Sequence, residues 1–425
     1  MTTGPRSRTP FTGLSRPEES KAEMKIAVLS YAFLNDMGGS QITLHGMMER
    51  LTARGHEIVL YIPSSVFAEC SDFIMRLGYR VRPLILPLMY RGLKTAPALY
   101  FRFLNLYFDR LQKEENFDVW TGWMAYPMGV AVSQWAAGRN VPSVVRCAGS
   151  DIQILSEIGY GDRQDRRIDR LVREWLPRAG KMIALSASVG EEYRKIGISD
   201  EKTAYIPCGV DLERFEKRLD KIEIRKRYGL PEKKFIFITV GRNHPKKGFR
   251  VLVEACAHIK KRGFDDFGIL FVGKDVSSLV NYGRELGVEA QLYFIEEMGR
   301  EKEGVLAFPS DEIVALYRAS DACAFPSLLE TFALIVVEAW AAGLPVITTD
   351  APGCGEIVRD GQDALVAHAG DSKDLAEKMI LVLENQELRK RLSVEGRRKA
   401  EIYSWTNIGG EWEKLFEGLK ERSKT

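Results

Sequence analysis

The sequence predicts an α/β protein of two domains, each built around a parallel, doubly wound β-sheet. The chain has 425 residues, which is longer than a single domain usually is. Short apolar segments of strand character alternate with segments of helical periodicity, which is typical of parallel sheets covered by helices. The alternation pauses and begins again at Lys233, so we expect a second array of the same kind.

The first array begins with the apolar run KIAVLSY and continues through a loop that contains Gly38 and Gly39. Apolar side chains at helical spacing follow this loop and stop at Gly55, which predicts the first helix. The expected elements of this array are strands over 25–31, 56–63, 117–123 and 141–147 and helices over 40–55 and 127–140.

The second array opens with the strand pattern KKFIFITVGR. The expected elements are strands over 233–242, 267–273, 321–327 and 344–350 and helices over 249–263, 312–320 and 333–343. The charged tail over 371–424 is also predicted to be helical. In two such domains, ligands are expected in the cleft that faces the carboxyl ends of both sheets.

These patterns divide the chain into an N-terminal domain over 24–207, a charged linker over 208–232 and a C-terminal domain over 233–400. Residues 401–425 are expected to form a helix that packs back towards the N-terminal domain. Residues 1–23 lack the apolar core of a secretory signal, so we predict a disordered tail, or a chain whose natural start is later, with the fold beginning near Met24.

The composition argues against several classes of protein. A net charge of +3 without a dense Lys/Arg run does not favour a nucleic-acid partner. The six cysteines are scattered without metal-ligand spacing, which indicates a reducing, cytoplasmic setting. No run of about 18 apolar residues predicts a transmembrane helix. The chain has neither a GxGxxG motif after its first strand nor a P-loop, so dehydrogenase and P-loop NTPase interpretations both fail.

The loop GRNHPKKG, which follows the first strand of the second array, carries candidate phosphate ligands. Arg242 stands at the carboxyl end of the strand and Lys247 just before the next helix. Two cations in these positions can neutralise a diphosphate. We interpret Lys246 as a solvated surface residue.

The segment LLETFALIVVEAWAAGLPVITTD places two glutamates in an otherwise apolar run. A buried carboxylate needs a partner or a ligand, because burying an unpaired charge is unfavourable. Glu330 is expected just before a helix that begins between Thr331 and Ala333, and Glu338 two turns inside it. Free amide groups at the start of this helix suit an anionic phosphate. The alternative is that Glu338 is a core residue with a structural partner.

The E-x7-E spacing of Glu330 and Glu338 occurs together with GRNHPKKG, IPCGVDLERF, AGSD and the Gly-Gly loop in the order found in family-4 retaining glycosyltransferases. PGCGEIVRDGQDALV is also similar to the segment that follows E-x7-E in that family. The resemblance covers residues 24–419. It implies the GT-B fold, in which two Rossmann-like domains hold a nucleotide-sugar in the cleft between them.

The resemblance implies a hexosyltransferase that moves a sugar, with retention, to a glycan, lipid-linked or small-molecule acceptor. UDP is the expected carrier and GDP its main competitor. No cofactor is implied, and no metal is expected, because Arg242 and Lys247 balance the diphosphate charge and no Asp-x-Asp follows a strand. No protein nucleophile is required, since the departing diphosphate assists the incoming hydroxyl on the same face.

Carried over to this chain, the resemblance implies that Arg242 and Lys247 contact the diphosphate. Glu338 would bind the ribose, and Glu330 would lie against the transferred sugar and its phosphate. The remaining donor contacts would come from the Gly-Gly loop and the start of the helix, at Gly38, Gly39, Thr331, Phe332, Ala333 and Leu334.

The chain departs from the family's pattern at Thr121 and Trp123, where many relatives have two histidines. Asp151 of AGSD has two possible interpretations. It either orients or deprotonates the acceptor hydroxyl, or it caps the helix that follows. His244 is left between a phosphate contact and a solvent-exposed residue. Cys208, where the family frequently has Asn, is interpreted as a packing residue.

Residues 76–113 contain eight Lys/Arg and one acidic residue, interleaved with aromatic side chains. The aromatic residues are Tyr79, Tyr90, Tyr100, Phe101, Phe103, Tyr107 and Phe108. Such a segment can lie on an anionic membrane surface, at the inner face of the membrane. It can equally be an ordinary helix that buries its rings while its arginines reach outward.

Two alternatives to a transferase remain. The first is a nucleotide-sugar epimerase or hydrolase on the same fold, which would need no acceptor pocket. The second is a catalytically silent binding protein, which only the loss of the two histidines favours. The joint presence of Arg242, Lys247, Glu330 and Glu338 favours the transferase.

Overall fold

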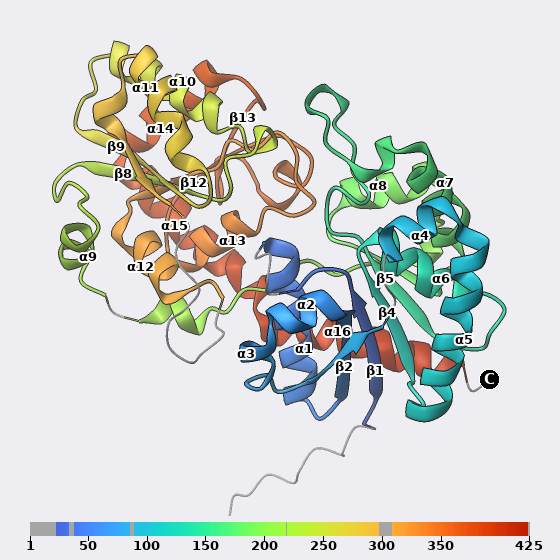
Figure 1. Ribbon diagram of the computed structural model, residues 1–425. Coiled ribbons are helices and arrows are strands. Elements are labelled where there is room, and N and C mark those ends of the chain that lie inside the picture. Colours follow the sequence, from blue (N-terminus) through green and yellow to red (C-terminus); the bar gives the residue numbers. More distant parts are fainter. Residues whose placement is uncertain (1–22, 34–37, 86–88, 218, 297–307, 424–425) are drawn as a thin grey trace, which may run out of the picture.

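The computed structural model describes residues 23–33, 38–85, 89–217, 219–296 and 308–423, which form two α/β domains (Figure 1). Each domain contains one sheet, and all paired strands run parallel. The predicted fold class is therefore confirmed. Of the predicted N-terminal tail, only the last residue lies within the described part.

The N-terminal domain has a seven-stranded sheet in the order β3-β2-β1-β4-β5-β6-β7. Its strands are β1 Lys25–Ser30, β2 Glu57–Pro63, β3 Arg80–Leu84, β4 Val119–Trp123, β5 Ser143–Arg146, β6 Lys181–Ala184 and β7 Thr203–Tyr205. Its helices are α1 Gly39–Ala53, α2 Ser64–Glu69, α3 Ser71–Ile74, α4 Met89–Thr95, α5 Pro97–Glu115, α6 Val130–Ala136, α7 Arg166–Trp175 and α8 Ala187–Lys195.

The C-terminal domain has a six-stranded sheet in the order β10-β9-β8-β11-β12-β13. Its strands are β8 Phe235–Val240, β9 Phe267–Val272, β10 Leu292–Ile295, β11 Ala322–Ala324, β12 Val346–Thr349 and β13 Leu365–Ala367. The helices of this half are α9 Lys221–Arg227, α10 Phe249–Lys261, α11 Val280–Glu285, α12 Asp311–Ala319, α13 Leu334–Ala341, α14 Ser372–Glu384, α15 Gln386–Ala400 and α16 Trp405–Arg422.

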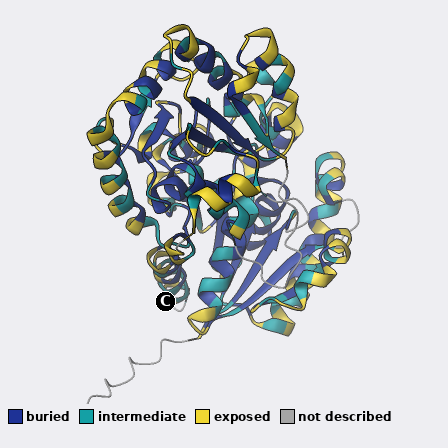
Figure 2. Cartoon of the chain, turned by 90° about the vertical axis from the view of Figure 1, so that its left-hand side faces the viewer, coloured by how far each residue is buried: buried dark blue, intermediate teal, exposed yellow. Residues whose placement is uncertain are grey.

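The sheets form the buried layers of the molecule, and the helices carry the exposed side chains (Figure 2). Every residue of β4 and β9 is buried, as expected for parallel strands covered on both faces. The strand order reverses between β1 and β4 in one sheet and between β8 and β11 in the other. Ligands of such sheets bind beyond the carboxyl ends of the strands at these switch points.

Five strands were not predicted, and four of them, β3, β7, β10 and β13, are the edges of the two sheets. An edge strand is short and only partly buried, so it lacks the continuous apolar run that marks a central strand. In β7, for example, no residue is buried. The fifth, β6, has only four residues.

The predicted linker over 208–232 is wrong in part, because α9 belongs to the C-terminal domain. The guanidinium of Arg225 on α9 donates to Oδ2 of Asp321 at 2.6 Å and to the carbonyl oxygen of Ala319 at 2.8 Å. This anchors the second half of the linker beside α12.

The last helix returns to the N-terminal domain, as predicted. The Nη1 atom of Arg54, which follows α1, lies 2.9 Å from Oε2 of Glu413 on α16. The indole of Trp405 packs so closely on α1 that a Cβ at Gly46 would lie 2.2 Å from it. The helix therefore joins the end of the chain to its first helix (Figure 1).

Candidate active site

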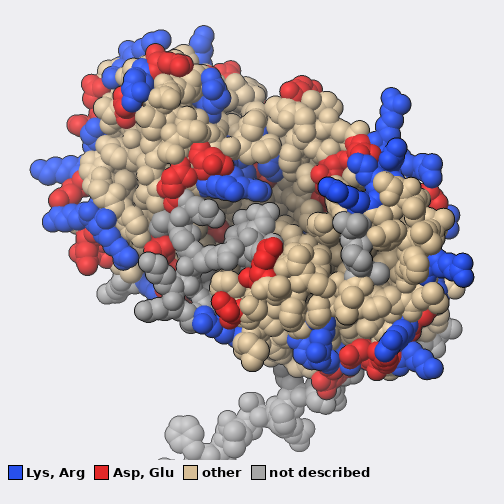
Figure 3. Space-filling view, viewed as in Figure 1, with Lys and Arg blue, Asp and Glu red and all other residues tan. Residues whose placement is uncertain are grey.

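The loops that follow β5 and β11 meet between the two domains. The side-chain amide of Gln153 donates to the carbonyl oxygen of Glu330 at 2.7 Å, and the Thr331 hydroxyl lies 3.3 Å from the carbonyl oxygen of Ala148. The surface is hollowed between the two lobes, and acidic and basic side chains gather at the edge of the hollow (Figure 3). This is the switch-point region in which a ligand is expected.

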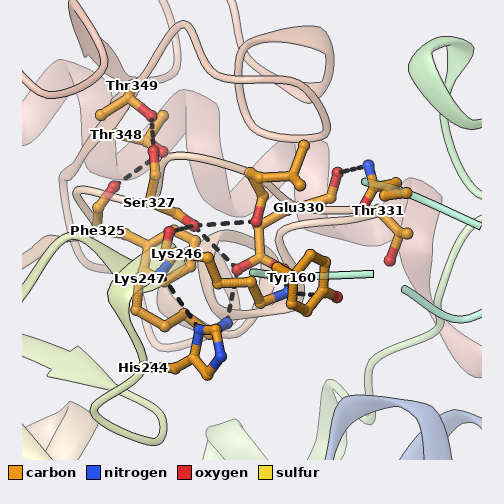
Figure 4. A network of polar contacts seen from close by, with 12 residues as sticks. Tyr160, His244, Lys246, Lys247, Phe325, Ser327, Glu330, Thr331, Thr348 and Thr349 are labelled. Carbon is orange, nitrogen blue, oxygen red and sulfur yellow. Dashed lines mark hydrogen bonds and ion pairs between the residues drawn. The ribbon is translucent and has the colours of Figure 1, made fainter. Parts of the chain in front are cut away.

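Glu330 is the centre of a polar network formed by the loops after β8 and β11 (Figure 4). Its Oε1 atom lies 2.6 Å from Nζ of Lys247 and accepts from the Ser327 hydroxyl at 3.0 Å. Its Oε2 atom lies 3.4 Å from Nζ of Lys246. Burial by itself raises the pKa of Glu330, but the two lysines outweigh burial and hold the pKa below its ordinary value. The carboxylate is therefore ionised and paired.

Lys246 was predicted to be a solvated surface residue, and this is wrong. Its ammonium group lies 3.4 Å from Glu330 and 3.4 Å from the hydroxyl of Tyr160, and 4.9 Å from the centre of the Tyr160 ring. Tyr160 belongs to the N-terminal domain, so no local pattern around Lys246 revealed this contact. Tyr160 and Gln153 are site residues that the sequence analysis missed.

The backbone of the GRNHPKKG loop is fixed to the loop after β11. The carbonyl oxygen of Lys246 accepts from the amide of Leu328 at 2.7 Å and from the hydroxyl of Ser327 at 3.0 Å. Gly248 has a φ of +66°, and a Cβ there would lie 2.0 Å from the carbonyl oxygen of Pro326. Only glycine fits this turn, which brings Lys247 to Glu330.

Arg242, the other predicted phosphate ligand, is exposed, and its guanidinium has no hydrogen-bond or ion-pair partner within the described residues. His244 lies nearby, and burial together with Lys246, Arg242 and Lys247 lowers its pKa. Its Nδ1 atom accepts from the amide of Lys246 at 3.3 Å, so it shapes the loop. The local field is positive, as an anion site requires. No three His, Cys, Asp or Glu side chains of the described ranges are grouped to hold a metal ion.

Glu338 lies inside α13, as predicted, and it has a structural partner. Its Oε2 atom accepts from the hydroxyl of Tyr317 at 2.9 Å, and the residue is only 5% exposed. Burial raises its pKa to about 7, although Tyr317 and Lys247 both lower it. The alternative that Glu338 has a structural partner therefore holds, while the predicted contact with a ribose stays a prediction.

Two of the three amides predicted to bind phosphate are already occupied. The amide of Ala333 donates to the carbonyl oxygen of Gly353 at 3.1 Å, and that of Leu334 to the carbonyl oxygen of Phe332 at 2.9 Å. The helix begins at Leu334, later than predicted. Among the described residues, the amides of Thr331 and Phe332 have no hydrogen-bond acceptor, so they remain the available donors.

The Gly-Gly loop leads directly into α1. Gly38 is the N-cap residue with a φ of −160°, and Gly39 begins the helix. A Cβ at Gly39 would meet no described protein atom within 4 Å. The predicted close approach of the donor at this loop stays a prediction.

Asp151 is completely buried among the loops that follow β4 and β5. Its carboxylate accepts from the amides of Ala125 at 2.6 Å, Gly149 at 2.6 Å and Ala148 at 2.9 Å. The predicted acceptor-orienting role is therefore wrong, because both oxygens are used to hold two loops. The helix-cap alternative is also wrong, since the residues that follow form a turn.

The positions of the family's two histidines are filled by buried side chains. Trp123 lies under the guanidinium of Arg146, which is 4.3 Å from its ring, and donates to the Ser40 hydroxyl at 3.0 Å. Thr121 is fully buried, and its hydroxyl has no partner within the described part of the chain. Cys208 is buried and lies 3.4 Å from Nη2 of Arg146, which agrees with its interpretation as a packing residue.

Only part of the aromatic segment over 76–113 faces solvent. Tyr79, Phe101 and Phe108 are buried, so these three rings cannot contact a membrane, and for them the alternative of buried rings holds. Phe103 is 53% exposed and lies on α5 between the exposed Leu99 and Leu106. In the described ranges, no helix is long and apolar enough to cross a membrane.

Two family models match consecutive parts of the chain. Residues 37–214 match the model for Glycosyltransferase Family 4, and residues 220–399 match that for Glycosyl transferases group 1. The chain therefore joins two glycosyltransferase domains.

Relatives of known name support this assignment. The chain is 28% identical over 247 residues to the D-inositol 3-phosphate glycosyltransferase of Nocardia farcinica, covering 55% of this chain and 52% of that protein. It thus spans about half the length of that relative. It is 24% identical over 413 residues to the phosphatidyl-myo-inositol mannosyltransferase of Mycobacterium leprae, covering 93% and 96% of the two chains.

Solved structures share the fold. Anabaena HepE in complex with UDP-glucose superposes with a TM-score of 0.73 at 20% identity, over 93% of this chain and 100% of that one. WaaG, a glycosyltransferase involved in lipopolysaccharide biosynthesis, superposes with a TM-score of 0.68 at 18% identity, over 92% and 100%. The architecture is thus GT-B.

Proposed function

We propose that this chain of two glycosyltransferase domains moves a sugar from a nucleotide-diphosphate donor to an acceptor hydroxyl. The proposal extends to a UDP-sugar as donor, retention at the anomeric carbon and a reaction without a metal ion. The nucleotide-sugar would lie at the C-terminal domain, and the acceptor would approach from the N-terminal domain.

The observation that carries the proposal is the cationic cluster around Glu330. Lys246 and Lys247 surround one carboxylate, and the exposed Arg242 stands beside them. One negative charge faces three positive ones, so the cluster can accept a dianionic diphosphate. The amides of Thr331 and Phe332 lie in the loop after β11 and have no acceptor among the described residues, so they would add donors for phosphate oxygens.

The remaining parts of the proposal have separate support. UDP is favoured because HepE, which shares the fold, was crystallised with UDP-glucose. Retention without a protein nucleophile agrees with the contacts of Asp151, whose buried carboxylate is occupied by backbone amides, and with Cys208, which is buried against Arg146. Metal independence rests on the three cations, which supply the charge that a divalent ion would otherwise bring.

A panel of nucleotide-sugars tests the proposal. The protein is incubated with UDP- and GDP-linked hexoses, and released nucleotide and sugar products are measured. Slow release of nucleotide, faster when an acceptor is added, is the expected result. A new sugar epimer would indicate the epimerase alternative, and binding without any product would indicate a silent binding protein.

We further propose that the enzyme works in the cytoplasm, at an anionic membrane surface. All six cysteines are buried, and no disulfide bond links them within the described part of the chain, as in a reducing compartment. The exposed face of α5 presents Leu99, Phe103 and Leu106 at helical spacing, with the exposed Arg102 beside them. A lipid-linked or membrane-bound acceptor would be reached from this domain.

A further inference from the structure

Lys246 and Lys247 of the GRNHPKKG loop contact different oxygens of one carboxylate, that of Glu330. Nζ of Lys247 lies 2.6 Å from Oε1 of Glu330, and Nζ of Lys246 lies 3.4 Å from Oε2 (Figure 4). Both ammonium groups are largely screened from water, with side chains 18% and 15% exposed. The two contacts are therefore part of one partly desolvated charge cluster.

Lys246 is held in this position from both domains. Its backbone is fixed to the loop after β11 through Leu328 and Ser327. Its ammonium group lies 3.4 Å from the hydroxyl and 4.9 Å from the ring centre of Tyr160 in the N-terminal domain. An aromatic face and a hydroxyl oxygen both stabilise a cation.

Tyr160 is itself positioned by its own loop. Its amide and carbonyl pair with Leu155 at 3.1 Å and 2.9 Å, closing a short hairpin. Its hydroxyl lies against Gly149, where a Cβ would approach to 2.8 Å. The hydroxyl therefore fits because position 149 lacks a side chain.

A diphosphate bound by Lys247 competes with Glu330 for the same ammonium group. Glu330 is 6% exposed, and a buried carboxylate that loses its counter-ion strongly destabilises a site. A second cation that remains beside Glu330 would keep the carboxylate paired while Lys247 binds the diphosphate. Lys246 is such a cation, because it lies beside the other carboxylate oxygen.

On the basis of the proposed function, we propose that Lys246 is the resident counter-ion of Glu330, which leaves Lys247 available to the diphosphate, and that Tyr160 is the positioning residue for Lys246. Because Tyr160 and Lys246 come from different domains, the charge balance of the donor site depends on the contact between the domains. The groups that face Glu330 and can titrate or carry charge are Lys246, Lys247, His244, Tyr160 and Cys354.

Calorimetric titration with UDP tests this assignment. The full chain and the Lys246→Met, Lys246→Arg and Tyr160→Phe variants are titrated at about pH 8 in two buffers of different ionisation enthalpy. The difference between the buffers gives the number of protons taken up on binding. Lys390→Met removes an exposed lysine on α15 and serves as the matched control.

In Lys246→Met, UDP affinity is expected to fall at least about tenfold. When Lys247 binds the diphosphate in this variant, the Glu330 carboxylate is left buried without a counter-ion. Binding should then be accompanied by uptake of about one proton, since Glu330 is neutralised from solvent instead. Lys246→Arg should restore both values, and Tyr160→Phe should weaken binding by a smaller factor. The wild-type protein and Lys390→Met should bind UDP without this proton uptake.

The outcomes separate the two proposals. If Lys246→Met binds UDP with wild-type affinity and no proton uptake, the assignment of Lys246 is overturned and the nucleotide site stands. If the wild-type protein binds neither UDP nor GDP, the proposed function is wrong, and the assignment of Lys246, which depends on it, is wrong as well. Thermal melting of each variant shows whether it is folded. If Lys246→Met does not fold, Tyr160→Phe carries the test, and wild-type UDP affinity in that variant would overturn the assignment.

Discussion

The hydroxyl of Tyr317 lies 2.9 Å from Oε2 of Glu338, so the second glutamate of the E-x7-E spacing has a partner on the neighbouring helix α12. Burial nonetheless raises the pKa of Glu338 to about 7. A ribose hydroxyl of the nucleotide-sugar would therefore donate to a carboxylate that titrates close to neutral pH. We predict that this relationship affects both stability and ligand binding.

We predict that Glu338 makes the protein less stable as the pH rises. Its pKa in the folded chain is raised from 4.5 to about 7, so the folded state favours the protonated form. Stability falls between these two pKa values, by about 3 kcal/mol at most. In Glu338→Gln, the melting temperature should change less over this range than in the wild-type protein.

Tyr317→Phe is the matched control for this prediction. It removes the hydrogen bond that lowers the pKa of Glu338, so the fall in stability should extend to higher pH. For Glu338→Gln, donor affinity should also fall by roughly tenfold if the carboxylate binds the ribose. A variant with altered stability but unchanged UDP affinity would leave Glu338 a purely structural residue.

Glu330→Gln should separate turnover from nucleotide binding. The substitution removes the charge that holds Lys247, so UDP affinity should stay the same or increase. The sugar loses a charged acceptor, so kcat should fall by at least about tenfold. Binding is measured by calorimetry and kcat by nucleotide release. A large loss of UDP affinity at unchanged kcat would show that Glu330 supports the nucleotide and not the sugar.

Asp151→Asn should destabilise the protein, because the carboxylate accepts from three backbone amides in the core of the N-terminal domain. Each hydrogen bond to a charged acceptor contributes about 1.5–3 kcal/mol, and the new NH2 group cannot accept from an amide. The melting temperature should therefore drop clearly. Unchanged melting combined with lost turnover would restore the general-base interpretation that the geometry argues against.

The exposed face of α5 should bring the protein to anionic vesicles. Phe103→Asp or Leu106→Asp should lower co-sedimentation with phosphatidylglycerol vesicles by about tenfold, because burial of such a side chain contributes about 1.5–3 kcal/mol. Val394→Asp, on an exposed position of α15, should have no effect. If all variants co-sediment equally with the vesicles, or if the wild-type protein does not co-sediment, α5 does not bind membranes and is an ordinary surface helix.

The elements and site residues that could be predicted from the sequence are those that leave a local pattern in it. Central strands such as β8 and β9 are continuous apolar runs and were predicted, whereas partly buried edge strands were not. Glu330 and Lys247 were both assigned to the donor's phosphates by the family resemblance, and the strands before their motifs, β8 and β11, are neighbours in the sheet. Their partners Tyr160 and Gln153 come from the other domain, so only the folded structure brings them there.

Two errors arose from side chains whose partners are set by loop geometry. Asp151 resembles a catalytic acid in sequence, but three amides converge on it when the loops after β4 and β5 fold together. Lys246 looks like a surface lysine until the loop turns at Gly248 and carries it to Glu330. Neither contact leaves a periodic pattern in the chain.

The most direct test of the nucleotide site is a titration of the protein with UDP in the presence of EDTA, with Lys247→Ala beside the wild-type protein. We predict that the wild-type protein binds one UDP per chain without a divalent ion, and that Lys247→Ala weakens binding by roughly tenfold or more. Binding that disappears in EDTA and returns with Mg²⁺ or Mn²⁺, or that Lys247→Ala leaves unchanged, would contradict the assignment of this cationic cluster to the diphosphate.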